Sequence, residues 1–277
     1  MKTLKALCAP RDSVFDSSKR DTVLNLSHLV DGKVDSKAFF EESYVTDGMK
    51  TLLTESFRRL RGESEQAVFK LTQAMGGGKT HNLITLGLLA KHPEHRASVL
   101  SGLPDAKSLK GVRVVAFSGR ETDVPHGIWG EIARQLGKHD AFKEYYQPLK
   151  APGRTAWINL LKGEPTLILL DELPPYLDNA KATTVGNSDL AKVTATALTN
   201  LFEAVAEAEL KNVCVVLTDL VGTYAEASAQ IQQVLQQLQN EAQRHSMNLT
   251  PVQINTDEFY HIIRKRLFKT LPKDSDI

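Results

Sequence analysis

The stretch QAMGGGKTHN, at residues 73–82, combines three glycines with a lysine and a threonine. It fits the phosphate-binding pattern G-x-x-x-x-G-K-[ST], except that Gln73 stands where the first glycine is expected. In such a loop, backbone N–H groups and the first turn of the following helix bind phosphate oxygens. The stretch therefore predicts a nucleoside triphosphate site. The structural alternative is a glycine turn that only caps a helix.

The chemistry of the loop side chains predicts their roles. Lys79 is expected to neutralise the β- and γ-phosphates, and the Thr80 hydroxyl is expected to bind Mg²⁺. The backbone around the phosphates is expected to come from Met75, Gly76, Gly77 and Gly78. The three glycines supply the freedom that a close approach of backbone to phosphate requires.

Two carboxylates, Asp171 and Glu172, end the apolar run LILLDE. A P-loop hydrolase needs an acidic residue at the end of a buried strand to hold Mg²⁺, which predicts that role for Asp171. Glu172 would then orient or deprotonate the water that attacks the γ-phosphate. Alone, the pair could equally be a solvated strand end. Together with the loop it indicates Mg-ATP and an ATPase with its own catalytic glutamate, rather than a nucleotide kinase.

Two more polar residues are candidates for the same reaction. In such ATPases a later strand ends in a residue that contacts the γ-phosphate or the attacking water, which predicts Thr218, with Asp219 as the second choice. Arg244 ends a glutamine-rich helix, where related enzymes place an arginine that reaches a neighbouring subunit's γ-phosphate. A structural role explains each residue equally well: Thr218 could cap a turn, and Arg244 could be a favourable cation at a helix C-terminus.

Apolar periodicity indicates which elements position these residues. Strands are expected at 67–73, 111–119, 165–177, 212–219 and near TPVQI at 250–254. Helices are expected at 46–62, 79–92, 126–137, 155–163, 188–210, 225–245 and 256–271, and residues 1–40 form a loop-rich lead-in. This alternation predicts an α/β fold with three layers, a P-loop NTPase with a mostly parallel five-stranded sheet.

Composition narrows the class of protein. The 277 residues are 42% hydrophobic and 24% charged, and 34 basic residues against 33 acidic ones argue against a strongly basic nucleic-acid surface. Cys8 and Cys214 lack the spacing of a zinc site or a disulfide framework. No signal peptide is recognisable, and no run approaches the roughly 18 apolar residues of a membrane span. A soluble, cytoplasmic protein without a membrane partner is therefore expected.

Several stretches between residues 43 and 268 resemble a bacterial family catalogued as domain of unknown function 499. They are SYVTDGMKTLL, QAMGGGKTHNLITLGLLAKH, IWGEIARQLG, LILLDELPPYL and TPVQINTDEFYHIIRKRLF. The family includes P-loop ATPase subunits of BREX-type phage-defence systems. Its members commonly carry AFGGGKTHS or a close variant, so the resemblance implies that Gln73 is a family habit. It also gives His81 a role near the phosphates, although an exposed first-turn histidine explains that residue equally well.

The resemblance implies an AAA+-like (ASCE) ATPase core with a truncated helical lid. Residues 1–42 are then the lead-in, 43–255 the core and 256–277 the start of the lid. The implied partners are other subunits of a defence operon, and further copies of the chain are a second expectation. Hydrolysis would drive remodelling of a protein or DNA complex, and the alternative is an ATP-binding scaffold with little turnover.

A cluster of cations near the C-terminus raises the question of direct DNA binding. Its members are Arg264, Lys265, Arg266, Lys269 and Lys273. They would either contact DNA phosphates or form the solvated face of a lid helix, and the second explanation is favoured. Any action on DNA is then expected to be indirect.

Overall fold

A five-stranded parallel sheet forms the centre of the computed structural model, which describes residues 8–16, 25–73, 76–105, 107–218, 229–252 and 257–270. The strand order is β3 (Arg113–Ser118), β4 (Thr166–Asp171), β7 (Val213–Thr218), β2 (Val68–Leu71) and β8 (Ser246–Leu249). All neighbouring pairs are parallel. The expected α/β class with a parallel five-stranded sheet is therefore confirmed.

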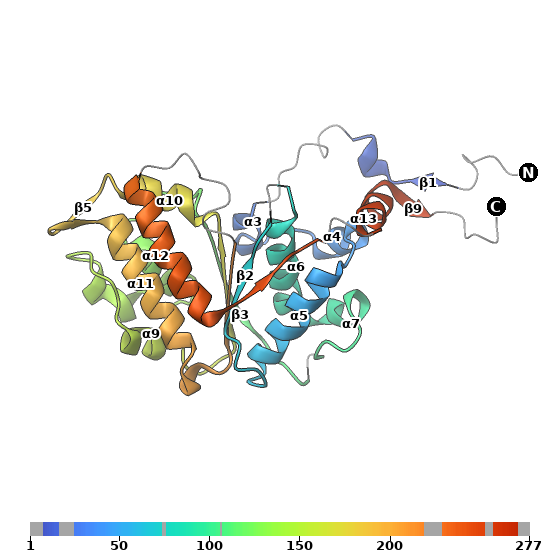
Figure 1. The fold of residues 1–277 in the computed structure, drawn as a ribbon. Coiled ribbons are helices and arrows are strands. Elements are labelled where there is room, and N and C mark those ends of the chain that lie inside the picture. Colours follow the sequence, from blue (N-terminus) through green and yellow to red (C-terminus); the bar gives the residue numbers. More distant parts are fainter. Residues whose placement is uncertain are drawn as a thin grey trace, which may run out of the picture.

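Helices cover both faces of this sheet, so the domain has three layers (Figure 1). One face packs against α3 (Ser27–Val30), α5 (Asp47–Leu60) and α6 (Lys79–Lys91). The other packs against α8 (Gly127–Gln135), α9 (Arg154–Leu161), α10 (Leu173–Ala180), α11 (Leu190–Val205) and α12 (Ala229–His245). Alternate residues of β4 divide between the two cores: Ile168 and Leu170 face the second group, and Leu167 and Leu169 face the first.

Shorter elements complete the described part of the chain. They are α4 (Ser36–Glu42), α7 (Arg96–Val99), α13 (Glu258–Leu267), the paired strands β1 (Ala9–Pro10) and β9 (Phe268–Thr270), and the hairpin β5 (Thr184–Val185) and β6 (Ser188–Asp189). Four 3-10 segments cover Asp12–Val14, Pro93–His95, His139–Tyr145 and Ala208–Leu210. No helix among the described residues has the length and apolar character that crossing a membrane requires.

The fifth strand lies earlier than expected. β8 follows α12 directly and pairs with β2 from Ser246 to Leu249, whereas the sequence favoured residues 250–254, which contain valine and isoleucine. Backbone pairing with β2 decides the position, although Met247 and Asn248 are poor markers of a strand. Residues 253–256 lie outside the described part of the chain.

Two further expectations of the sequence analysis were wrong in their boundaries. The strand expected at 165–177 ends at Asp171, and α10 begins at Leu173 with prolines in its first turn, where a missing N–H costs no helical bond. The helix expected at 256–271 ends at Leu267, because residues 268–270 pair with β1. The lead-in also contains α3 and α4. Leu29 of α3 packs closely on Gly87 of α6, because a Cβ on Gly87 would lie 2.2 Å from Leu29 Cδ2.

A buried arginine joins several elements at the end of the sheet where the strands begin. Arg59 of α5 is 1% exposed, and its guanidinium donates hydrogen bonds to the carbonyls of Ser64, Val205, Leu210 and Val213 at 2.6–2.9 Å. These carbonyls belong to segments far apart in the chain. The guanidinium therefore fixes α5 against β7 and the end of α11.

Candidate functional site

The glycine loop lies between the end of β2 and the start of α6, so the structure has the strand–loop–helix order of a phosphate-binding loop. Gly76 has φ of 79° and Gly78, the N-cap of α6, has φ of 77°, a left-handed conformation that strains other residues. A Cβ on Gly77 would lie 2.5 Å from the side chain of Gln73. Met75 lies outside the described residues, so its expected backbone role stays a prediction.

Gln73, which replaces the first glycine of the pattern, has contacts of its own. Its amide Nε2 donates to the carbonyl of Val252 at 3.0 Å, and its Oε1 accepts from the N–H of Val252 at 3.1 Å. Its carbonyl accepts a hydrogen bond from Lys79 Nζ at 2.5 Å. The replacement therefore ties the glycine loop to the segment that follows β8.

Thr80 and Asp171, the two residues predicted to hold Mg²⁺, are in direct contact. Thr80 Oγ1 donates a hydrogen bond to Asp171 Oδ2 at 2.6 Å, although 91 residues separate the two in the chain. Asp171 ends β4 and is 3% exposed. Burial raises the pKa of its carboxyl, and hydrogen bonds from Thr80 and Thr218 act in the opposite direction.

Glu172 follows in a strained conformation. Its φ of 48° is the only positive φ of a non-glycine residue in the part of the chain that the structure describes. Its N–H donates to Thr218 Oγ1 at 3.0 Å, and the same hydroxyl hydrogen-bonds Asp171. Thr218 therefore lies within the site and joins the two acidic residues, whereas Asp219 lies outside the described residues.

Arg120 is a site residue that the sequence analysis missed. Its guanidinium binds the Glu172 carboxylate in two places, Nε to Oε2 at 2.5 Å and Nη2 to Oε1 at 3.2 Å. The backbone at Gly119 also lies close to the backbone of Glu172. Glycine is needed there, because a Cβ would lie 1.9 Å from the Glu172 carbonyl oxygen. One signal was available: Arg120 follows a strand, and the carboxyl ends of parallel strands form the usual ligand site.

His81 is packed, so the alternative of an exposed first-turn histidine does not hold, and its expected role near the phosphates stays a prediction. Its ring stacks on Phe39 of α4 with centroids 4.7 Å apart and 25° between the planes. Burial, and to a smaller extent the charge of Arg266, lowers the pKa of His81 to about 4. Nδ1 is buried and has no hydrogen-bond partner among the described residues. The imidazole is therefore neutral near pH 7.

Comparison with known proteins places this site in a family. The family model of the DUF499 N-terminal domain matches residues 3–248. The chain belongs to the DUF499 family. No curated protein matches it. Among solved structures, the Aeropyrum pernix ORC2 protein in its ADPNP–ADP complexes is similar, with 16% sequence identity and a TM-score of 0.47. The match covers 87% of this chain and 57% of the ORC2 chain. With a TM-score and an identity this low, neither the fold nor the function of ORC2 is assigned to the DUF499 chain.

The fold does not bring Arg244 close to the other candidate site residues. It precedes β8, whose first residue Ser246 pairs with Val68 at the start of β2, so Arg244 lies at the end of the sheet opposite the glycine loop. Its side chain is 70% exposed and pairs with Glu241 at 3.0 Å. A contact with a nucleotide of its own chain does not fit this position. A contact with a neighbouring copy stays a prediction.

A pocket of about 760 Å³ opens between the glycine loop and α13. The loop contributes Gly76, Gly77 and Gly78. The remaining wall is mostly apolar and comes from the stretch between the end of α4 and the start of α5, the start of α6, Val252 and α13; it includes Tyr44, Met49, His81, Phe259, Ile263 and Arg266. The volume suits a drug-sized ligand such as a nucleoside with its phosphates.

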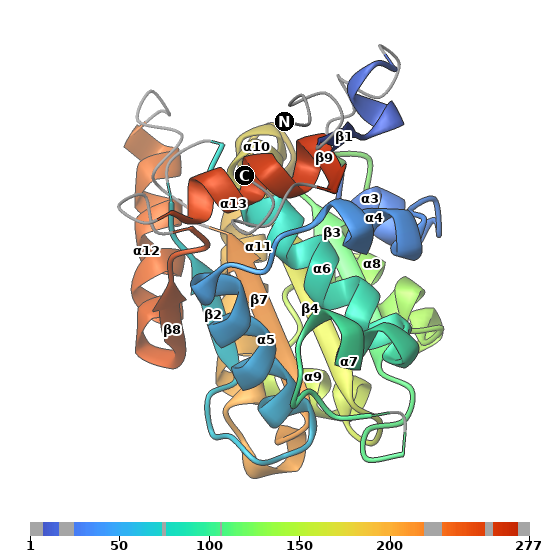
Figure 2. The same cartoon turned by 90° about the vertical axis from the view of Figure 1, so that its right-hand side faces the viewer.

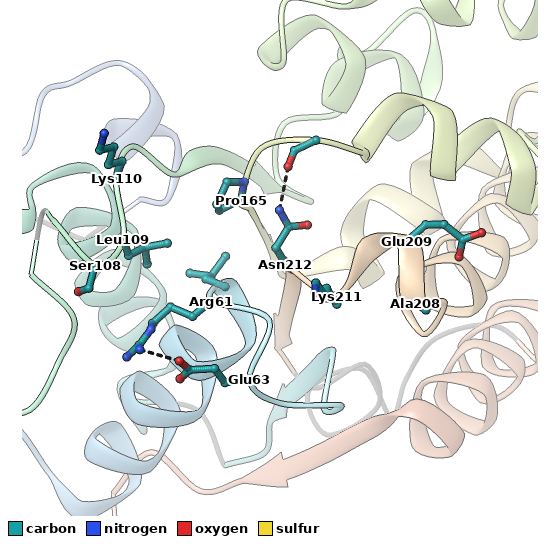
Figure 3. Close-up of a pocket in the computed structure, with 12 residues that line it drawn as sticks. Arg61, Glu63, Ser108, Leu109, Lys110, Pro165, Ala208, Glu209, Lys211 and Asn212 are labelled. Carbon is teal, nitrogen blue, oxygen red and sulfur yellow. Dashed lines mark hydrogen bonds and ion pairs between the residues drawn. The ribbon is translucent and has the colours of Figure 1, made fainter.

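A second hollow, of about 730 Å³, lies at the other end of the sheet (Figure 3). Pro165 and Asn212, which precede β4 and β7, line it. Some of its polar groups bind one another: Arg61 pairs with Glu63, and Asn212 Nδ2 donates to the Gly163 carbonyl at 2.9 Å. Ligands of parallel sheets bind at the carboxyl ends of the strands, so the loop pocket is the stronger candidate.

Proposed function

We propose that this chain binds Mg-ATP at the glycine loop and hydrolyses it. The observation that supports this most directly is the 2.6 Å hydrogen bond from Thr80 to Asp171. A solvated strand end gives no reason for a buried carboxylate to contact the hydroxyl at the start of the phosphate-binding helix. A magnesium site explains the contact, because two residues that supply oxygen ligands to one ion must lie side by side.

The residues present fit Mg²⁺ bound together with a nucleotide. Magnesium in such sites takes one or two protein ligands and completes its shell with phosphate oxygens and water. Within the described residues, no group of three or more histidines, cysteines and acidic residues could hold a metal by itself. When bound, Mg²⁺ neutralises charge on the β- and γ-phosphate oxygens.

In this proposal each residue of the chain has one task. Lys79 exchanges the Gln73 carbonyl for phosphate oxygens, and the backbone of Gly76–Gly78 surrounds the phosphates. Glu172 orients the attacking water and accepts its proton. The Thr218 hydroxyl hydrogen-bonds both Asp171 and Glu172 and so fixes their positions relative to each other.

A second candidate function is an ATP-binding scaffold with little turnover. The Arg120–Glu172 ion pair favours it, because a carboxylate bound to Arg120 is not free to contact the attacking water. Hydrolysis then requires Glu172 to leave Arg120, and a scaffold would keep the pair closed.

Phosphate release measured beside ATP binding separates the two candidates. The variants are Lys79→Ala and Glu172→Gln. The matched control is Lys91→Ala, which removes a lysine at the other end of α6 together with its hydrogen bond to the Leu29 carbonyl. Hydrolysis predicts that wild type and Lys91→Ala release phosphate, that Glu172→Gln binds ATP without releasing it, and that Lys79→Ala binds poorly. If wild type binds ATP without phosphate release, the scaffold is correct, and if wild type does not bind ATP, both candidates fail.

The cellular setting is proposed from the resemblance alone: an AAA+-like ATPase in the cytoplasm that acts with other subunits of a defence operon and acts on DNA only indirectly. Assembly of several copies would bring Arg244 to a neighbour's nucleotide. Light scattering with Mg-ATP tests this last part. A chain that stays monomeric, with equal activity per chain at all concentrations and in Arg244→Ala, contradicts it.

A further inference from the structure

The side chain of Gln73 lies between the glycine loop and residues 250–252, which follow β8. β8 lies beside β2 and near α5 (Figure 2). The Gln73 amide makes two hydrogen bonds with Val252, one from Nε2 to the carbonyl at 3.0 Å and one from the N–H to Oε1 at 3.1 Å. The same side chain lies against Gly77, because a Cβ there would be 2.5 Å from Gln73 Cγ and Cδ. One side chain therefore links the loop to a segment that is distant in the sequence.

Both groups of the Gln73 amide take part in this link. A glutamine amide donates through nitrogen and accepts through oxygen, so it can bind the N–H and the carbonyl of one residue together. Glycine, which the usual pattern has at this position, offers neither contact. The main chain of Gln73 also binds the lysine of the loop, since Lys79 Nζ donates to the Gln73 carbonyl at 2.5 Å. Gln73 thus contacts both the middle glycine and the lysine.

Residues 250–252 are themselves fixed to α5. Thr46, the N-cap of α5, is 2% exposed, and its Oγ1 donates to the Pro251 carbonyl at 2.5 Å. Gly48 approaches the same segment so closely that a Cβ there would lie 2.0 Å from the Thr250 carbonyl oxygen. α5 in turn buries its apolar face in the core beside the sheet. Through Gln73, the glycine loop is attached to a part of the fold that packing holds in place.

We propose that Gln73 is a positioning residue, which holds the glycine loop in the shape that receives phosphates by fixing it to residues 250–252. The inference rests on the proposed function, since it assumes that the loop binds a nucleotide. A loop with three consecutive glycines has many accessible conformations when nothing restrains it. A loop that is already restrained loses less freedom when phosphates bind, and its affinity for them is higher.

Gln135 of α8 makes the same pair of hydrogen bonds elsewhere in the fold. Its Oε1 accepts from the Ala116 N–H and its Nε2 donates to the Ala116 carbonyl, both at 2.9 Å. Nε2 also donates to Glu131 at 2.7 Å. Ala116 lies within β3, and neither Gln135 nor Ala116 is among the residues that line the loop pocket. Gln135→Met is therefore a matched control, which loses similar hydrogen bonds away from the glycine loop.

Equilibrium binding of Mg-ATP tests the inference with wild type, Gln73→Met and Gln73→Gly. Methionine has a similar length without the amide, and glycine restores the usual pattern of the loop. We expect about fivefold weaker binding in Gln73→Met, from the loss of two hydrogen bonds that restrain the loop, and at least as large a loss in Gln73→Gly. Gln135→Met should change the affinity less than twofold. Thermal unfolding without nucleotide checks that each variant is folded at the temperature of the binding measurement.

A double-mutant cycle with Gly48→Ala tests whether Gln73 acts through residues 250–252. The added methyl group displaces this segment, because it collides with the Thr250 carbonyl. We expect Gly48→Ala to weaken Mg-ATP binding in the wild-type background and to change it less than twofold in the Gln73→Met background. A merely structural role of Gln73 predicts equal effects of Gly48→Ala in both backgrounds, and that result would overturn the inference.

The outcomes distinguish this inference from the proposed function. Wild-type affinity in Gln73→Met and Gln73→Gly, beside weak binding by Lys79→Ala, would overturn the inference and leave the nucleotide site intact. Equal losses in Gln73→Met and Gln135→Met would overturn it too, because general destabilisation would then explain both. If wild type does not bind Mg-ATP, or if Lys79→Ala binds as tightly as wild type, the proposed function fails and the role of Gln73 fails with it.

Discussion

Removing Arg120 is predicted to raise the rate of ATP hydrolysis. Arg120 holds Glu172 through two contacts, and their side chains are 64% and 38% exposed. An exposed bidentate pair of this kind contributes about 0.5–1 kcal/mol after solvent screening. If the pair must open before Glu172 can act on water, its loss lowers the barrier by that amount. Because about 1.4 kcal/mol corresponds to a factor of ten, Arg120→Ala should hydrolyse about two- to fivefold faster.

The assay is steady-state phosphate release at saturating Mg-ATP. Arg134→Ala is the matched control, because Arg134 binds Glu131 on α8 in the same two-point manner and is exposed to a similar degree. The difference between Arg120→Ala and wild type should shrink as salt rises, since screening weakens the pair. A tenfold or greater loss of activity in Arg120→Ala would refute the reasoning, because Arg120 would then act in the reaction. Identical rates at every salt concentration would also contradict it.

Three further predictions concern stability and the acidic pair. Because the folded-state pKa of Asp171 is raised, the fold loses stability as pH rises from the unfolded pKa through the folded one, and at neutral pH Asp171→Asn should resist urea better than wild type while losing affinity for Mg-ATP. Glu172→Gly should be more stable than Glu172→Gln by about 1 kcal/mol in urea titrations, because glycine adopts the left-handed conformation without strain. Arg59→Met should cost about 3 kcal/mol or more, since several buried carbonyls lose their donor, and a midpoint of thermal unfolding equal to that of wild type would contradict this.

The local sequence was enough to predict the loop and the acidic strand. Lys79, Thr80 and the glycines are neighbours in the chain, and only a few backbone geometries accept that order of residues. Asp171 could be predicted because it ends a continuous apolar run, the pattern of a strand buried on both faces. Its contact with Thr80 then follows from the way parallel strands bring their carboxyl ends together.

Residues that depend on the order of strands could not be predicted in the same way. Arg120 reaches Glu172 because β3 lies beside β4, and a single sequence does not reveal which strands are neighbours. Gln73 looked like a missing glycine because its partner, Val252, is 179 residues away. The two interpretations of His81 could not be separated, because Phe39, on which its ring stacks, lies in a lead-in with no clear periodicity. Tertiary contacts determine all three roles.

The most direct test of the central claim is the affinity of wild type and Lys79→Ala for Mg-ATP, measured by calorimetry on the same preparation. We expect saturable binding of one nucleotide by wild type and at least tenfold weaker binding by Lys79→Ala, because the variant loses the cation beside the phosphates. The Lys91→Ala control should bind as wild type does. Equal affinity in wild type and Lys79→Ala, or no binding by either, would contradict the claim that the glycine loop is a nucleotide site.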